Sequence, residues 1–384
     1  MGIRAAQHVL VAPDKFKGSA TAAEVAEHVA IGIRRAAPQV RVTAMPVADG
    51  GDGTVDAAVA AGFTRREATV AGPLGDPVRA AFALRGDTAV VEMAEASGLR
   101  RLPGGHQAPL DADTRGTGEL IRAALDAGAK TIVLGVGGSA STDGGAGMLA
   151  ALGARLLDAD GDELPGGGAA LVRLAVADLA GLDPRLSAAQ VVLASDVDNP
   201  LLGEHGAAAI YGPQKGASTH DVALLESGLA QLADVLSRSL GPAAAHAAEA
   251  PGAGAAGGVG FAALAVLGAV QQPGIDILLT ALGFDRALSE ATFVITGEGC
   301  LDEQTLRGKA PAGVARAARR AGLPVAAVCG RLELTPRQLG EAGFAAAYAL
   351  ADFEPDPARS MAQPLPVLER LAARLAADLL LAES

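Results

Sequence analysis

A recurring order of segments constrains the fold of this chain more than any other feature. Short apolar runs rich in valine and isoleucine are followed by glycine-containing polar loops and then by alanine-rich stretches with helical spacing. The runs lie at residues 9–12, 131–136, 191–195, 293–296 and 325–329. Strands that alternate with helices in this way are typical of βαβ units in a parallel sheet. We therefore expect an α/β fold.

The first of these units carries the clearest local signals. A polar loop covers residues 13–20, and Thr21 and Glu24 then have the spacing of a capping box for a helix that we expect to reach Ala36. The loop lies at the N-terminus of this helix, where free N–H groups and the helix dipole attract anions. Ligands of open α/β sheets bind at the carboxyl ends of the strands, so such loops are where functional residues are expected.

A different pattern between about residues 68 and 95 indicates a second structural region. Alternating strand-like stretches flank a turn rich in glycine and proline there, which predicts a β-hairpin or a small mixed sheet. The first unit and the last two resemble parts of one doubly wound parallel sheet. We therefore expect an outer domain of residues 1–66 and 286–384, with a second α/β domain and its mixed sheet inserted at 67–285. A length of 384 residues and a hydrophobic content of 50% suit two domains with separate cores.

The charge and the cysteine content exclude several classes of partner and environment. A formal net charge of −12, without a large Lys/Arg cluster, argues against nucleic acid as a partner. The longest uncharged stretch, residues 251–275, is interrupted by glycines and predicts a buried loop and helix rather than a membrane span. The N-terminus shows no export signal, and two cysteines are too few for a disulfide scaffold, so we expect a cytoplasmic protein with small-molecule partners. A monomer and a homodimer both stay open.

Lysine is rare in this chain, with five residues against 26 arginines. Four of the five lie in glycine-containing polar loops: Lys15, Lys17, Lys215 and Lys309. A lysine ammonium is a compact charge on a flexible stem, which suits a cation that must follow a phosphoryl group as it moves. Surface loops also collect lysines without any function. The four loops are nevertheless the first candidates for a site that handles anions.

The loop richest in glycine spans residues 137–147, and we call it the glycine loop. Its glycines allow backbone N–H groups to approach phosphate oxygens, while Ser139 and Thr142 add donors and Asp143 could reach a metal or a ribose hydroxyl. It is not a Walker loop, and Ala140 occupies the third glycine position of the dinucleotide fingerprint. A phosphate cradle and an ordinary glycine turn are the two interpretations.

Carboxylates follow several of the predicted strands, at Asp49, Asp196, Asp198 and Glu298. At a strand end, such a group can accept the proton of a substrate hydroxyl or hold Mg²⁺. The sequence Asp198-Asn199-Pro200 is also a common turn, so Asp196 is the stronger functional candidate. Acids and lysines at strand ends favour phosphoryl transfer from a magnesium nucleotide. Zinc-ligand spacing and a Gly-x-Ser-x-Gly elbow are both absent from the sequence.

Nine segments in order along the chain resemble the type I glycerate kinase family. They include Ala-Pro-Asp-Lys-Phe-Lys-Gly-Ser at 12–19 and Asp-Gly-Gly-Asp-Gly-Thr at 49–54, and the others lie at 116–121, 137–140, 143–145, 196–201, 214–217, 254–258 and 296–299. The resemblance implies a cytoplasmic enzyme that uses ATP and Mg²⁺ to phosphorylate D-glycerate, with the 2-hydroxyl favoured as the acceptor. It also implies a Rossmann-like domain, an inserted α/β domain, and an active site in the cleft between them.

The resemblance also implies roles for individual residues. We expect Asp196 to take the proton of the substrate hydroxyl, and Lys17 and Lys309 to neutralise the oxygens of the transferring phosphoryl group. The residues expected to bind ATP and its phosphates are Gly137, Gly138, Ser139, Thr142, Asp143, Gly144, Gly145 and Lys215. Those expected to bind the substrate are Asp14, Lys15, Asp49 and Arg115, with Arg115 as the fork for the glycerate carboxylate. Those expected to hold Mg²⁺ are Asp198 and Glu298.

One position departs from the family pattern, because Cys300 stands where the family often has arginine. Arg307 is a candidate substitute for that cation. Three other functions stay open: a kinase for a related small hydroxy acid, a glycerate 3-kinase, and a pseudoenzyme that binds a nucleotide or an anion without turnover.

Overall fold

A computed structural model describes residues 8–306 and 308–380, and the chain divides into two compact units. Unit 1 comprises Met1–Asp49, Asp56–Gly62 and Ile275–Ser384, and unit 2 comprises Gly50–Val55 and Phe63–Gly274. The borders expected from the sequence, after residues 66 and 285, lie at 62 and 274 in the structure. The short segment Gly50–Val55, which the sequence pattern assigns to the outer domain, instead groups with unit 2.

Unit 1 contains a five-stranded parallel sheet in the order β13-β12-β11-β1-β2. The strands are β1 (His8–Pro13), β2 (Arg41–Ala44), β11 (Phe293–Leu301), β12 (Val325–Leu332) and β13 (Ala346–Ala349). The chain leaves β1 toward one edge and continues from β11 toward the other edge. The strand order therefore reverses between β1 and β11, and such a switch point is where doubly wound sheets bind their ligands.

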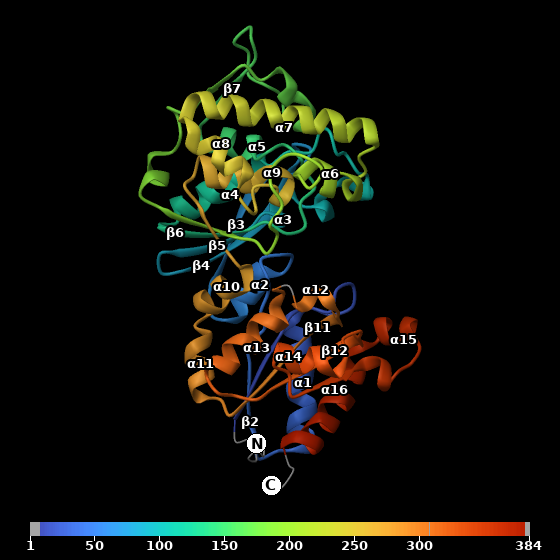
Figure 1. The fold of residues 1–384 in the computed structure, drawn as a ribbon. Coiled ribbons are helices and arrows are strands. Elements are labelled where there is room, and N and C mark those ends of the chain that lie inside the picture. Colours follow the sequence, from blue (N-terminus) through green and yellow to red (C-terminus); the bar gives the residue numbers. More distant parts are fainter. Residues whose placement is uncertain (1–7, 307, 381–384) are drawn as a thin grey trace. The chain divides into compact units, whose positions relative to one another are not determined.

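Helices pack on this sheet because alternate strand residues point to opposite faces. On one face, Val9, Val11 and Ile295 contribute to a core with α1 (Ala22–Ala36) and α16 (Pro364–Leu375), which lie side by side in Figure 1. The predicted capping box is confirmed, since Thr21 and Glu24 exchange the two expected hydrogen bonds. Helix α13 (Ala310–Arg320) packs against β1, β11 and β12. The other helices of unit 1 are α11 (Phe284–Glu290), α12 (Glu303–Leu306), α14 (Pro336–Ala342) and α15 (Pro357–Ala362), followed by a π-helical turn at Ala376–Leu380.

Unit 2 contains a mixed six-stranded sheet in the order β10-β9-β6-β5-β4-β3. The strands are β3 (Thr64–Ala71), β4 (Pro77–Arg85), β5 (Thr88–Glu92), β6 (Thr131–Gly135), β9 (Gln190–Ala194) and β10 (Val270–Gln272). The three strands from β3 to β5 pair antiparallel, which is the mixed region that the sequence pattern predicts. The pairs β5–β6, β6–β9 and β9–β10 are parallel, and β7 (Arg155–Leu157) with β8 (Val176–Asp178) forms a separate small sheet.

The helices of unit 2 share one large core with this sheet. They are α3 (Ala94–Ser97), α4 (Arg115–Asp126), α5 (Ala146–Ala151), α6 (Ala207–Tyr211), α7 (Thr219–Leu240), α8 (Pro242–Glu249) and α9 (Ala255–Ala265). Two further helices, α2 (Thr54–Ala60) and α10 (Gly274–Leu282), span the borders of the division. The long helix α7 packs against α6 and α8 (Figure 1). The uncharged stretch 251–275 includes α9, whose Val259 and Phe261 are fully buried in the core, as expected. Among the described residues no helix is both long and apolar enough to span a membrane.

Candidate active site

Three carboxylates gather at the carboxyl ends of neighbouring strands in unit 1. Asp14 follows β1 and its backbone N–H donates to the carbonyl oxygen of Gly297 in β11, at 2.8 Å. Glu298 is the next residue of β11, and Asp49 follows β2. Asp14 and Glu298 are each only 7% exposed. We call Asp14, Asp49 and Glu298 the carboxylate cluster. It lies at the switch point of the sheet, between the ends of β1 and β11.

Burial and mutual repulsion change the acidity of this cluster. Burial, together with the charges of Asp49 and Glu298, raises the pKa of Asp14 to about 7, while Lys15 opposes the shift. Burial also raises the pKa of Glu298. Like charges held close together in a poorly solvated site require either a bound proton or a cation. The cluster therefore has the oxygen donors and the excess negative charge that suit Mg²⁺.

Two further lysines, Lys17 and Lys309, lie in loops near the cluster. The ammonium of Lys309 lies 3.4 Å from Glu298 Oε2 and 3.7 Å from Asp302 Oδ1, and Thr305 Oγ1 donates to Glu298 Oε1 at 2.6 Å. Lys309 is also the N-cap of α13, whose first N–H groups favour anions. Lys17 is exposed, and its backbone nitrogen would lie only 3.3 Å from a Cβ at Gly299. The structure thus brings together six residues of the predicted site: Asp14, Lys15, Lys17, Asp49, Glu298 and Lys309.

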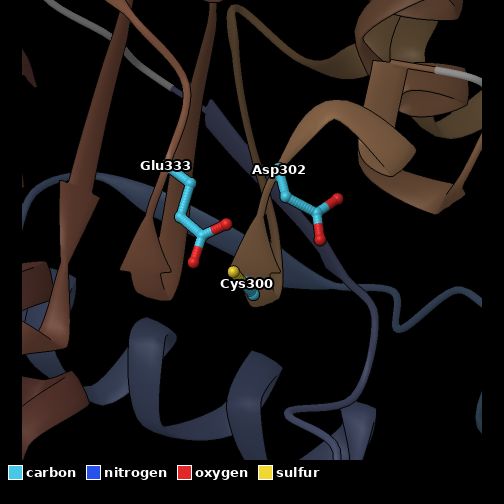
Figure 2. Close-up of side chains that lie close together, drawn as sticks. All are labelled: Cys300, Asp302 and Glu333. Atoms are coloured by element: carbon cyan, nitrogen blue, oxygen red, sulfur yellow. The ribbon is translucent and has the colours of Figure 1, made fainter.

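Figure 2 shows a second group of polar side chains in unit 1, formed by Cys300, Asp302 and Glu333, whose ligand atoms lie within 4.8 Å of one another. Arg331 pairs with Cys300 in the β11–β12 register and forms an ion pair of 2.7 Å with Glu333. Burial raises the pKa of Cys300, so the sulfur is a neutral thiol at neutral pH. Glu333 is paired with Arg331, and Asp302 shares Lys309 with Glu298, so the group is an ion-paired surface rather than a metal centre.

Cys300 in this group is the position at which the chain departs from the family pattern. Arg307, the expected substitute for an arginine at position 300, lies outside the described residues. The structure instead places Arg331 beside Cys300, a neighbour that the sequence alone could not reveal because it lies on another strand.

In unit 2 the glycine loop follows β6 and is held by a dense set of hydrogen bonds. Asp143 is fully buried and accepts from Thr114 N and Oγ1, at 2.9 and 2.7 Å, and from the N–H groups of Gly145 and Gly147, both at 3.1 Å. Gly144 and Gly145 have φ values of 64° and 78°, which only glycine adopts readily. Asp143 therefore organises the loop. Its carboxylate is buried among hydrogen-bond donors of the protein itself, whereas the sequence suggested contact with a metal or a ribose hydroxyl.

Lys215 also lies inside unit 2. Its side chain is fully buried, and its ammonium donates to the carbonyl oxygen of Ser141 at 2.5 Å. Burial lowers the pKa of Lys215 to about 7, against the opposing charge of Asp143. The buried hydroxyls of Ser141 and Thr142 have no hydrogen-bond partner among the described residues. Lys215 therefore lies at the glycine loop, as the sequence suggests, but its ammonium is buried inside unit 2.

The remaining predicted residues lie elsewhere in unit 2. Asp196 and Asp198 follow β9 and are exposed, and Asp196 Oδ1 accepts from Gly274 N at 3.0 Å. Arg115 begins α4 with an exposed side chain, and its backbone N–H donates to Asp113 Oδ1 at 3.0 Å. Burial, aided by the charge of Asp143, raises the pKa of Asp113 to about 6.

Sequence reasoning missed Glu92, a buried residue at the end of β5. Its carboxylate accepts from the N–H groups of Gly53 and Val55, at 3.1 and 3.2 Å, and from Arg100 at 3.1 Å. Burial raises the pKa of Glu92 to about 6. This carboxylate holds the segment that follows Asp49. The only hint in the sequence is an acid at the end of an apolar strand.

Comparison with known proteins extends across nearly the whole chain. The model of the glycerate kinase family matches residues 9–380. The glycerate kinase of Bacillus subtilis (strain 168) is 44% identical over 379 residues, covering 98% of both chains, and the glycerate 2-kinase of Escherichia coli (strain K12) is 46% identical over 327 residues, covering 84% of this chain and 85% of its own. A crystal structure assigned as glycerate kinase 2 from Salmonella typhimurium LT2 superposes with a TM-score of 0.83 at 42% identity, covering 97% of this chain and 98% of its own. The chain therefore belongs to the glycerate kinase family and is a kinase.

Proposed function

We propose that the protein transfers the γ-phosphoryl group of ATP to the 2-hydroxyl of D-glycerate. The observation that carries this proposal is the carboxylate cluster with its lysines at the switch point of unit 1, in a chain of the glycerate kinase family. Phosphoryl transfer depends chiefly on positioning and on neutralising charge, which acids that bind a cation and lysines that follow the phosphoryl group provide. The similarity to the glycerate 2-kinase of Escherichia coli supports the choice of hydroxyl.

Asp14, Asp49 and Glu298 fit a divalent cation, because they are three carboxylates at neighbouring strand ends, Asp14 and Glu298 are buried, and the pKa of each of these two is raised. Glu298 is therefore our first candidate to hold Mg²⁺, with Asp14 and Asp49 beside it, and Asp198 stays a candidate from the sequence. When bound, Mg²⁺ would supply charge neutralisation on the phosphate oxygens.

The chain's own residues would carry the remaining steps. Lys17 and Lys309 neutralise the oxygens of the phosphoryl group as it moves, and the N-terminus of α13 adds its free N–H groups. The glycine loop offers backbone donors to the nucleotide phosphates. Asp196 accepts the proton of the attacking hydroxyl, and Arg115 presents its planar fork to the carboxylate of glycerate.

A cytoplasmic location stays a proposal from the sequence, in which two cysteines are too few for a disulfide scaffold. The partners proposed are small molecules, glycerate and ATP. A homodimer stays a proposal from the sequence.

The function is tested by measuring ADP release with ATP, Mg²⁺ and a panel of D-glycerate, L-glycerate and other small 2-hydroxy acids. The proposal predicts the highest kcat/KM for D-glycerate and no turnover in excess EDTA. A different acid preferred by more than about tenfold would point to a related hydroxy acid kinase. ATP binding without turnover on any acid would indicate a nucleotide-binding pseudoenzyme.

A further inference from the structure

We propose that Lys215 is a positioning residue, which holds the glycine loop in its phosphate-binding shape from inside unit 2 and does not contact the phosphates. The inference rests on the proposed role of that loop in binding ATP. It assigns this lysine a different task from the one that its place in a glycine-containing loop suggests.

The backbone around Lys215 directs its side chain inward. Lys215 ends a short 3₁₀ turn, Pro213–Lys215, and Gly216 follows with a φ of 93°. Gln107 holds this turn, since its side-chain amide donates to the carbonyl oxygen of Gln214 at 3.1 Å. A Cβ at Gly216 would lie 2.7 Å from Gln107 Oε1, so a larger residue would force the two segments apart. Contacts that do not involve the side chain of Lys215 therefore hold the backbone of this turn.

Inside unit 2 the ammonium meets the middle of the glycine loop. Lys215 is 1% exposed, donates to the carbonyl oxygen of Ser141 at 2.5 Å, and faces the buried charge of Asp143. A buried ammonium is costly unless hydrogen bonds and an opposite charge compensate it. Here the loop itself supplies both, so the lysine and the loop depend on each other.

The loop is anchored on both sides of its contact with Lys215, because Ala140 N donates to Ser97 O and Gly144 N donates to Gly257 O, both at 2.9 Å, and Lys215 contacts Ser141 between them. The hydroxyls of Ser141 and Thr142 are buried without a partner among the described residues, so they do not anchor the loop. The carbonyl oxygen of Ser141 lies against Gly257, where a Cβ would approach it to 2.2 Å. Loss of the ammonium would remove the donor to this carbonyl in a tightly packed place, together with a positive charge that attracts Asp143. The segment between Ala140 and Gly144 would then be held less firmly, and the N–H groups of the loop would be less well aligned.

The first test uses the wild-type protein and compares the rates at which its five lysines react with acetic anhydride, with and without Mg·ATP. Peptide mass spectrometry gives each rate, normalised to the unfolded chain, and the exposed Lys130 serves as the reference. A positioning residue reacts far more slowly than Lys130 in the free enzyme, and ATP leaves that rate low. Fast reaction of Lys215 in the free enzyme, suppressed by Mg·ATP, would show a phosphate ligand and overturn the proposal.

The second test compares Lys215→Met with the matched control Lys130→Met. We expect Lys215→Met to raise KM for ATP on the order of tenfold, with KM for glycerate nearly unchanged, and to accelerate amide hydrogen exchange across residues 137–147. A weaker affinity for ATP with wild-type exchange in the loop would contradict positioning.

If Lys215→Met does not fold, the labelling of the wild-type protein still decides the question. A wild-type protein without kinase turnover would contradict the proposed function, whereas the labelling rates would still show whether the lysine is buried.

Discussion

At the scale of single residues, the carboxylates and lysines of unit 1 are the main feature of the molecule. Burying Asp14 beside Asp49 and Glu298 is unfavourable for folding, yet it concentrates negative charge where a nucleotide-bound cation is needed. Asp196 is different, because its carboxylate is exposed and accepts a backbone hydrogen bond from Gly274. Removing the charge of Asp196 should therefore affect mainly the reaction rate, whereas removing the charge of Asp14 should affect the stability of the fold.

Asp196→Asn tests the proposed proton acceptor. An amide of similar shape cannot take the proton, so we expect kcat to fall by about 10²–10⁴ while the KM values for ATP and glycerate change little. Steady-state kinetics provide the measurement, with Asp160→Asn as a control on an exposed turn of the same unit. A variant within a few-fold of the wild-type kcat would remove Asp196 from this role.

Asp14→Asn tests the cost of the buried carboxylate through the pH dependence of stability. The pKa of Asp14 is raised to about 7 in the folded state, above the ordinary value of 3.8, so the native state binds the proton more tightly between these values. Stability therefore falls as pH rises through this window, and the full cost is present above pH 7. We expect Asp14→Asn to be more stable than the wild type at pH 8, by on the order of a few kcal/mol, and to lose this advantage near pH 4.

Thermal unfolding at several pH values measures this difference. An Asn variant that is less stable than the wild type at pH 8 would show that the carboxylate makes favourable contacts that outweigh the cost of burying its charge.

At the scale of elements, the switch point between β1 and β11 explains why residues far apart in sequence form one cluster. The strand order places the loops after these two strands next to each other, and the hydrogen bond from Asp14 N to Gly297 O fixes them. Helices α1 and α16 share a core with one face of this sheet and pack closely against each other.

The metal proposal belongs to this scale, because it involves the ends of several strands. We expect MgCl₂ at pH 8 to raise the melting temperature of the wild-type protein, since the cation relieves repulsion within the carboxylate cluster. Glu298→Gln should remove most of this increase, whereas Glu333→Gln, in the ion-paired group with Arg331, should keep it. Equal responses of the two variants in a thermal shift assay would contradict the placement of the cation.

Gly32→Ala tests the contact between α1 and α16. A Cβ at this position would lie 2.3 Å from the carbonyl oxygen of Glu369, so we expect a loss of about 1–3 kcal/mol in the free energy of unfolding. Gly340→Ala in α14 is the matched control, because its Cβ meets nothing within 4 Å, and it should be neutral or slightly stabilising. Denaturant unfolding of both variants makes the comparison. Equal stabilities would show that the two helices can separate without cost.

At the scale of the whole molecule, the sequence predicts strands and local signals well because these depend on neighbouring residues. The apolar run at 9–12 lies within β1, and the Thr21 capping box is present. The assignment of Gly50–Val55 to unit 2 could not be foreseen, since the segment is held by contacts with residues distant in sequence, among them Glu92. The inward orientation of Lys215 likewise follows from tertiary packing, which a loop motif does not encode.

The proposed reaction of the whole protein is the transfer of a phosphoryl group from ATP to the 2-hydroxyl of D-glycerate. Phosphorus NMR of the product formed from ATP, Mg²⁺ and D-glycerate by the wild-type protein tests it without any variant. We expect 2-phospho-D-glycerate and ADP in equal amounts. Formation of 3-phosphoglycerate would contradict the proposed acceptor hydroxyl, and the absence of any phosphoglycerate would contradict the proposed reaction.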